Sequence, residues 1–140
     1  MPTDPLLAPY PLKHLTLRNR VVSTSHEPAY AEGGMPGLRY QLYHEEKARG
    51  GVALTMIGGS ANVSIDSPSS FGQLYLGEDR VVPHLRDLAD RVHAHGAAVM
   101  SQITHMGRRA PWDTDHWLPT VSSSAVREPA HRSYPKPAED

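Results

Sequence analysis

Short runs of apolar and β-branched residues alternate with longer amphipathic stretches along this chain. The runs of strand length are Arg20–Thr24, Val52–Ile57 and Ala97–Ile103. Between them, residues 38–49 and 82–92 place apolar side chains at helical spacing. The predicted order is strand, helix, strand, helix, strand, which is typical of a parallel sheet with crossover helices. Because the runs are continuous, we expect both faces of each strand to be buried.

Glycine and proline positions set the predicted bounds of these elements. Gly50–Gly51 ends the first helix and Gly96 ends the second, as a glycine beyond a last turn does. Pro83 suits the first turn of the second helix, where its missing N–H has little effect, and Asp79 is the expected cap. Gly58–Gly59 is expected to close the second strand.

The other segments are predicted to be caps and loops. Residues 5–19 suit a short hairpin or cap, because their leucines are separated by polar residues and prolines. Residues 25–38 and 60–80 are rich in glycine, proline and polar side chains, which is typical of loops. Residues 110–140 are proline-rich with few apolar positions, and we interpret them as an excursion after the third strand.

Composition narrows the class of protein. Lys and Arg number 14 and Asp and Glu number 15, a formal net charge of −1 that argues against nucleic acid or an anionic membrane as the main partner. The acidic, proline-rich start does not resemble a signal peptide, and no run approaches the roughly 20 apolar residues of a membrane span. We therefore expect a soluble cytoplasmic protein. The absence of cysteine excludes disulfides, thiol catalysis and an iron–sulfur cluster held by this chain.

The nine histidines raise the question of a metal site. His44–Ala48 begins like the helix of a zinc protease, but alanine stands where the second histidine ligand is required. His93 and His95 are two positions apart on a predicted helix and therefore face different sides. The sequence predicts no bound metal.

Three segments follow the predicted strands at the ends where ligands bind in parallel α/β folds. They are Ser23–Glu27, Ile57–Ser60 and Gln102–Arg109, and each is polar or glycine-rich where its apolar run stops. The Gln102 amide has donors and an acceptor that suit the edge of a flat heterocycle such as an isoalloxazine.

Each of these positions also has a purely structural interpretation. Gln102 is then a cap of its strand and Arg108 a solvated surface charge. Gly58–Gly59 is then a simple turn, without the spacing or the Lys-Ser/Thr of a phosphate-binding loop, and His26 bonds a loop carbonyl. On composition alone these interpretations are favoured, because most polar residues are structural.

Specific segments resemble the old yellow enzyme (NADH:flavin oxidoreductase) family. They are Leu17–Val22, with its Asn-Arg pair, the Gly-bounded strand Ala53–Ser60, and Gln102–Arg108, with the pattern Gln-x-x-His-x-Gly-Arg. Together, in this order and spacing, the segments form a strong signal, and the resemblance extends from about Leu6 to the proline-rich end.

The resemblance implies a fold and a cofactor. The fold is α/β, the N-terminal part of a TIM (β/α)8 barrel with three parallel strands, two crossover helices and an N-terminal hairpin or cap. FMN would lie noncovalently at the C-terminal mouth. Thr24, Ser25 and His26 match the family segment that lines the flavin, Gly59 matches a small residue that touches it, and Gln102 matches the amide that bonds its pyrimidine edge.

Two sequence features distinguish this chain among the members of the family that it resembles. Many members have proline and then Cys or Thr where this chain has Ser25 and Glu27, and that Cys or Thr commonly tunes the flavin. Ser23–Pro28, Trp112–Trp117 and Val126–His131 are more similar to the branch that oxidatively demethylates N-methylated amino acids and betaines. Related amine dehydrogenases often carry an iron–sulfur cluster, whose cysteines would lie outside this segment.

The resemblance also implies hydride transfer through the flavin N5 between a small-molecule substrate and an acceptor, with NAD(P)H as a possible electron donor. Gln102 would position the ring and His26 would lie near it, while no catalytic residue is assigned. Residues 1–140 would form a partial FMN-binding barrel, because the family's substrate-anchoring pair and phosphate loops follow later strands. We expect this chain alone to bind FMN poorly and to catalyse no turnover.

Two other functions remain open from the residues. One is a different phosphate-binding barrel enzyme of aldolase or isomerase type, with Gln102 and His105 acting on a sugar or an acid. The other is a small α/β binding module without catalysis. The sequence does not indicate the substrate, the electron donor and acceptor, or the oligomeric state.

Overall fold

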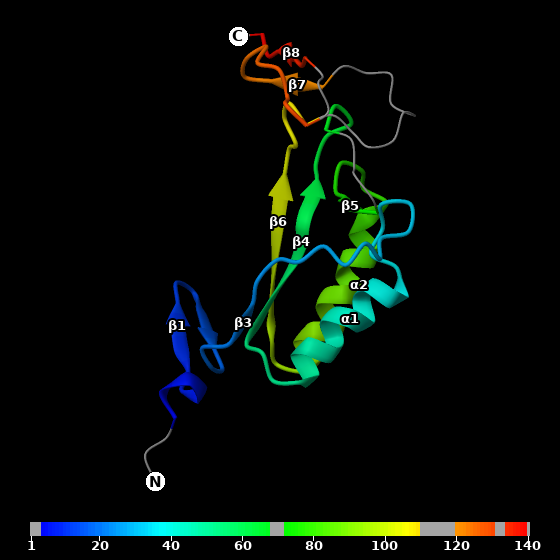
Figure 1. The fold of residues 1–140 in the computed structure, drawn as a ribbon. Helices are drawn as coiled ribbons and strands as arrows, with labels where there is room; N and C mark the ends of the chain where they lie inside the picture. Colours follow the sequence, from blue (N-terminus) through cyan, green and yellow to red (C-terminus); the bar gives the residue numbers. More distant parts are fainter. Residues whose placement is uncertain (1–3, 68–71, 110–119, 131–133, 140) are drawn as a thin grey trace.

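The computed structural model describes residues 4–67, 72–109, 120–130 and 134–139 (Figure 1). Its helices are α1 (Leu38–Arg49) and α2 (Val81–Ala94), preceded by a 3-10 turn η1 (Pro5–Leu7). Its strands are β1 (Tyr10–Leu12), β2 (Leu15–Leu17), β3 (Val22–Ser23), β4 (Leu54–Asn62), β5 (Leu74–Tyr75), β6 (Ala98–Thr104), β7 (Val121–Ser122) and β8 (Lys136–Pro137). None of the described helices has the length and apolar character needed to cross a membrane.

A parallel sheet with β4 at its centre organises the chain. β3 and β6 pair with β4 in parallel on opposite edges, and β5 pairs with the last two residues of β4. Figure 1 shows α1 and α2 side by side on one face of this sheet, with the β1–β2 hairpin near the amino ends of the strands. The predicted strand–helix order and the predicted N-terminal hairpin are therefore confirmed.

The main core lies between the two helices and β4. Leu88 and Val92 are one helical turn apart on α2 and are fully buried against Ile57 of β4 and Tyr40 of α1. Burying each large apolar side chain stabilises the fold by roughly 1.5–3 kcal/mol. A second cluster of Leu17, Ala53 and Leu54 joins the hairpin to the base of the sheet.

Two predicted strand bounds are wrong and one strand was not predicted, in each case because of a contact distant in sequence. The first strand is only Val22–Ser23, since the side chain of Asn19 accepts from Val21 N and donates to the Gly51 carbonyl, which holds the preceding residues in a turn. The second strand does not close at Gly58–Gly59 but continues to Asn62, because β6 pairs along it.

β5 is the third difference, because it lies inside the segment 60–80 that we expected to be a loop. Its backbone is held from two sides: Tyr75 N donates to the Gly34 carbonyl at 2.8 Å, and Leu76 N donates to the Asn62 carbonyl at 2.6 Å. Two residues are too few to produce a periodic signal, so only these pairings define the strand.

The helix bounds are close to the prediction. α1 ends with Gly50 as its C-cap, and Gly96, with φ of +69°, follows the C-cap of α2. The expected side-chain cap by Asp79 is wrong. Arg80 is the N-cap residue, and the Asp79 backbone carbonyl instead accepts from Val82 N at 3.0 Å.

The expectation that all strands are buried on both faces is wrong for β3, whose Val22 is 43 % exposed, and for β6. Met100 is 42 % exposed and Ile103 is 66 % exposed. β4 pairs with one edge of β6, and no strand among the described residues pairs with the other edge. The excursion of 110–140 contains the short β7–β8 pair, while the Trp112–Trp117 segment lies outside the described residues.

Arg18 fastens the base of this unit. Its guanidinium donates to the carbonyls of Ala48, Val52 and His95, at distances of 2.6, 2.8 and 2.6 Å. The last turns of α1 and α2 leave carbonyls without helical partners and carry partial negative charge, so one cation satisfies both helix ends. This contact gives the Asn-Arg segment of the sequence a structural role.

Arg18→Ala should lower the free energy of unfolding by about 1–3 kcal/mol, because hydrogen bonds from a charged donor are lost at three carbonyls. Arg18→Lys should recover only part of the loss, since an ammonium cannot span the same fork of acceptors. Chemical denaturation measures both changes. Arg49→Ala, which removes an exposed ion pair within α1, should change stability by less than about 0.5 kcal/mol. Equal effects at the two arginines would contradict this role.

Candidate functional site

A bulge in β4 brings three strand ends together. The register between β4 and β6 shifts between Gly58, which pairs with Gln102, and Ala61, which pairs with Ile103. Gly58 and Gly59 have φ of +86° and +109°, which L residues rarely adopt. Bulges of this kind redirect the chain at the rims of barrels and next to active sites.

The two glycines also allow very close contact between backbones. A Cβ on Gly59 would lie 2.8 Å from the carbonyl carbon of His26 and 2.9 Å from the backbone nitrogen of Glu27. A Cβ on Gly58 would lie 2.6 Å from the Gln102 carbonyl oxygen. The segment after β3, the bulge of β4 and the end of β6 therefore form one continuous surface.

Ser25 and Gln102 complete this surface. The Ser25 hydroxyl donates to Oε1 of Gln102, across 77 residues of sequence. Nε2 of Gln102 has no hydrogen-bond partner among the described residues, and the side chain is exposed. Four of the five predicted site residues thus lie together. We call Ser25, His26, Gly59 and Gln102 the ledge, and Thr24 is exposed one residue before it.

The ledge has the features that a flat ring with polar edges requires. Gly59 is exposed and has no side chain to obstruct a ring. The Gln102 amide has its oxygen engaged by Ser25, which leaves its Nε2 donors available to a ligand. The residues present therefore fit FMN at the C-terminal ends of the strands.

Glu27 and Tyr40 lie beneath the ledge, and sequence reasoning assigned neither a role. Oε1 of Glu27 accepts from Ala29 N at 2.8 Å, whereas Oε2 is buried with no hydrogen-bond partner among the described residues. Burial raises the pKa of Glu27 to about 7. The Tyr40 hydroxyl accepts from Gly58 N at 3.0 Å, and burial raises its pKa to about 12. A carboxyl group just beyond an apolar strand was the only sequence signal for this environment.

His44 supports the sheet from the helix side. It is fully buried, with Nδ1 2.8 Å from Thr55 Oγ1 of β4. Burial, and then the nearby Lys47, lower its pKa to about 4, so the ring is neutral near pH 7. His95 pairs with Glu45. Within the described residues, no three His, Cys, Asp or Glu side chains gather where a metal would bind.

A ring of buried polar side chains anchors the end of β4. Asn62 Nδ2 donates to Gln73 Oε1 at 3.2 Å, and Gln73 Nε2 donates to Ser60 Oγ at 2.9 Å. Ser67 Oγ donates to Asn62 Oδ1 at 3.4 Å. Because each group is nearly or fully buried and satisfied, the network fixes the loop after β4 relative to β5.

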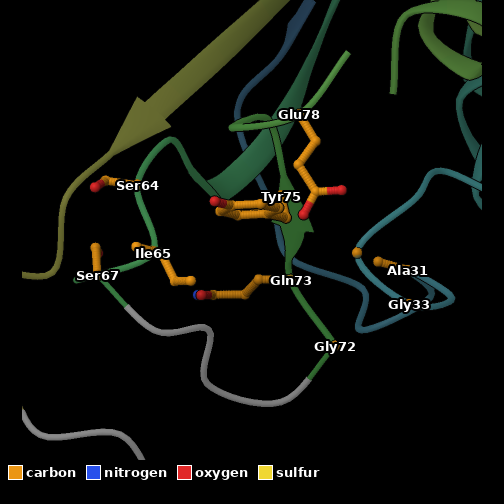
Figure 2. A pocket seen from close by; sticks show the side chains of 10 residues that line it. Ala31, Gly33, Ser64, Ile65, Ser67, Gly72, Gln73, Tyr75 and Glu78 are labelled. Carbon is orange, nitrogen blue, oxygen red and sulfur yellow. The ribbon is translucent and has the colours of Figure 1, made fainter. Parts of the chain in front are cut away.

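The pocket in Figure 2 is separate from the ledge. It has a volume of about 400 Å³ and lies between the loop before α1 and the segment around β5. Figure 2 shows Gln73 and Tyr75 extending across it toward Ile65 and Ser67. None of the five predicted site residues lines this pocket.

Comparison with known proteins decides the family. Residues 5–136 match the model of the NADH:flavin oxidoreductase / NADH oxidase family. The chain belongs to this family. Its members use FMN, with NAD(P)H as electron donor.

Two curated relatives and one solved structure are informative. A probable N-methylproline demethylase of Rhizobium meliloti is 58 % identical over 100 % of this chain and 21 % of its own length. A multifunctional alkene reductase/demethylase of Caballeronia cordobensis is 56 % identical over 99 % of the chain and 20 % of its length. Morphinone reductase in complex with tetrahydroNAD superimposes with a TM-score of 0.83 at 20 % identity, over 98 % of this chain and 41 % of that one.

These comparisons confirm the predicted fold and class of protein. The fold is that of the old yellow enzyme (β/α)8 barrels, of which β3, β4 and β6 form a part. Among the three predicted functions, they favour the flavin oxidoreductase over an aldolase or isomerase and over a non-catalytic module. The chain spans about a fifth of the length of the curated relatives it matches.

Gly59→Ala should destabilise the protein by about 1–3 kcal/mol more than Gly51→Ala, because only the alanine at position 59 meets backbone atoms. Gly51 is the matched control: its φ is +106° against +109° at Gly59, and nothing lies within 4 Å of its Cβ position. The free energies of unfolding of the two variants give the difference. If both variants lose the same free energy of unfolding, the positive φ alone, and not contact with neighbouring backbone, requires glycine at position 59.

The raised pKa of Glu27 gives a pH-dependent stability. Its folded value of about 7 exceeds the ordinary 4.5, so its contribution is full below pH 4.5 and is lost as pH rises through 7. Glu27→Gln does not ionise and should gain about 1–2 kcal/mol relative to the wild type between pH 5 and pH 8, less than a fully buried group would. Denaturation at both pH values tests this. Glu46→Gln, on the exposed face of α1, should show no such gain.

Proposed function

We propose that this chain forms one wall of the FMN site in a whole protein of the length of its relatives, and that this protein oxidatively demethylates N-methylated amino acids. The ledge is the observation that supports the proposal: Ser25, Gly59 and Gln102 are distant in sequence and meet at one exposed surface. The relatives named as demethylases support the reaction class.

Each ledge residue has a distinct part in holding the cofactor. Gln102 Nε2 would donate to the pyrimidine edge of the flavin, while Ser25 keeps the amide from rotating by occupying its oxygen. Gly59 would let the ring lie against the backbone, and Thr24 and His26 would line its margin. FMN supplies the hydride chemistry, and the protein supplies placement and electrostatics.

We assign no proton donor or base to the residues that the structure describes. His26 is exposed at the margin of the ledge, where it would face a substrate. The buried carboxyl of Glu27 and the neutral ring of His44 lie on the helix side of the sheet, where they support the ledge. We therefore assign proton transfer to residues from later strands of the barrel, because active sites of such folds take residues from the carboxyl ends of several strands.

The proposed partner is a small molecule, and NAD(P)H is an alternative electron donor in this family. The near-neutral net charge of −1 supports a small-molecule partner over nucleic acid or a membrane surface, and we place the protein in the cytoplasm. Alkene reduction is the second candidate, because one relative is named for both activities.

FMN titration of the apo form of the whole protein tests the ledge. Ser25→Ala should weaken FMN binding about three- to tenfold and Gln102→Leu about tenfold or more, because a hydrogen bond to the ring is loosened or lost. Mixing the loaded wild type with N-methylproline without oxygen should bleach the flavin absorbance and release formaldehyde once the oxidised N-methyl group is hydrolysed.

Ser101→Ala is the matched control for Ser25→Ala. Ser101 is the neighbour of Gln102 in β6 and points to the opposite face of the strand, so its removal should leave FMN affinity unchanged. If Gln102→Leu binds FMN as the wild type does, the ledge is not the flavin site. If N-methylated amino acids never bleach the flavin while an activated alkene reoxidises it, the second candidate replaces demethylation.

A further inference from the structure

The segment Gln102–Arg109 contains a histidine that the ledge does not use. His105 Nε2 lies 3.3 Å from Oδ1 of Asp66, in the loop after β4. The Ser64 hydroxyl donates to the same carboxylate oxygen. The pair joins two loops whose residues are 39 positions apart in the sequence.

A second hydrogen bond determines which nitrogen of the neutral His105 ring carries the proton. Gly107 N donates to His105 Nδ1 at 3.1 Å, so Nδ1 carries no proton in the neutral ring. The proton is therefore on Nε2, which donates to Asp66. Gly107 adopts φ of +60°, a turn that returns its N–H to the ring. The bonds from Ser64 and then His105 lower the pKa of Asp66, which stays ionised.

The same two loops are joined at a buried point. Met106 N donates to Ser67 Oγ at 2.7 Å, and Ser67 belongs to the buried polar ring around Asn62. The last ladder pair between β4 and β6 is Asn62 with Thr104. The contacts of His105 and Met106 therefore extend the attachment of β6 to β4 beyond the end of the ladder.

This attachment matters because β6 is held from one side only among the described residues. Its Ile103 is 66 % exposed, and Gln102 is exposed next to it. β4 and the loop after β4 thus fix the backbone at the end of β6, while the Ser25 hydroxyl holds the Gln102 amide oxygen. A partly exposed hydrogen bond between His105 and Asp66 contributes little to global stability, so its main effect is local.

We propose that Asp66 and His105 are positioning residues, a clasp that holds the end of β6 so that Gln102 presents its amide to the flavin. This inference rests on the proposed function. Without the contact between Asp66 and His105, the end of β6 adopts several arrangements. The apparent FMN affinity then decreases in proportion to the fraction of molecules that hold the arrangement that binds FMN.

FMN titration and visible circular dichroism of the whole protein test the clasp. Asp66→Ala and His105→Ala should each weaken FMN binding about three- to fivefold, since an exposed pair contributes at most about that factor. The double variant should be no weaker than either single one, because both remove the same interaction. Asp66→Asn keeps an oxygen that accepts from Ser64 and His105, and it should restore FMN affinity and the flavin dichroism of the wild type.

Glu46→Ala, which breaks a more exposed ion pair on α1, should leave both readouts unchanged. The clasp is refuted if Asp66→Ala and His105→Ala bind FMN like the wild type, or if their effects add in the double variant. Gln102→Leu in the same series separates the two hypotheses. If it weakens binding while the clasp variants do not, only the clasp fails; if it also has no effect, the proposed flavin site fails.

Discussion

Backbone contact through Gly58 and Gly59 is the constraint on which the ledge depends. At these two residues the register between β4 and β6 shifts, and the backbone of β4 lies in close contact with the segment after β3. Any side chain there would occupy space already filled by His26, Glu27 or Gln102. The Ser25 hydroxyl donates to Oε1 of Gln102 and so joins the segment after β3 to β6. A surface made mostly of backbone is flat and has few rotamers, which suits recognition of a rigid ring.

The helix side of the sheet supports this arrangement with neutral groups. The uncharged Tyr40 hydroxyl accepts a hydrogen bond from Gly58 N, which the bulge would otherwise leave buried and unpaired. His44 bonds Thr55 as a neutral ring, because burial disfavours its cation. Burial likewise favours the protonated form of Glu27. Tyr40 and His44 are therefore uncharged near pH 7, and the polar groups that a ligand would meet on the other side are those of Ser25 and Gln102.

Stability and recognition lie at opposite ends of the strands. Arg18 joins the carboxyl ends of both helices and the start of β4 at the base of the sheet. The ledge, the buried polar side chains around Asn62 and the pair of Asp66 with His105 lie at the carboxyl ends of β4 and β6. This division is expected of (β/α)8 barrels, in which the loops after the strands bind ligands and the opposite face contributes to stability.

The order of elements follows from the sequence by itself, because apolar periodicity and glycine ends are local properties; α1 matches its predicted bounds for this reason. The segments Leu17–Val22, Ala53–Ser60 and Gln102–Arg108 together indicated the family, and that resemblance implied four residues that meet at the ledge. Tertiary structure alone decided that β4 passes through Gly58–Gly59, that β5 forms, and that Oε2 of Glu27 is buried. Each of these depends on partners far away in the chain, such as β6 and Gly34, whose contacts leave no trace in the local pattern of apolar and polar residues.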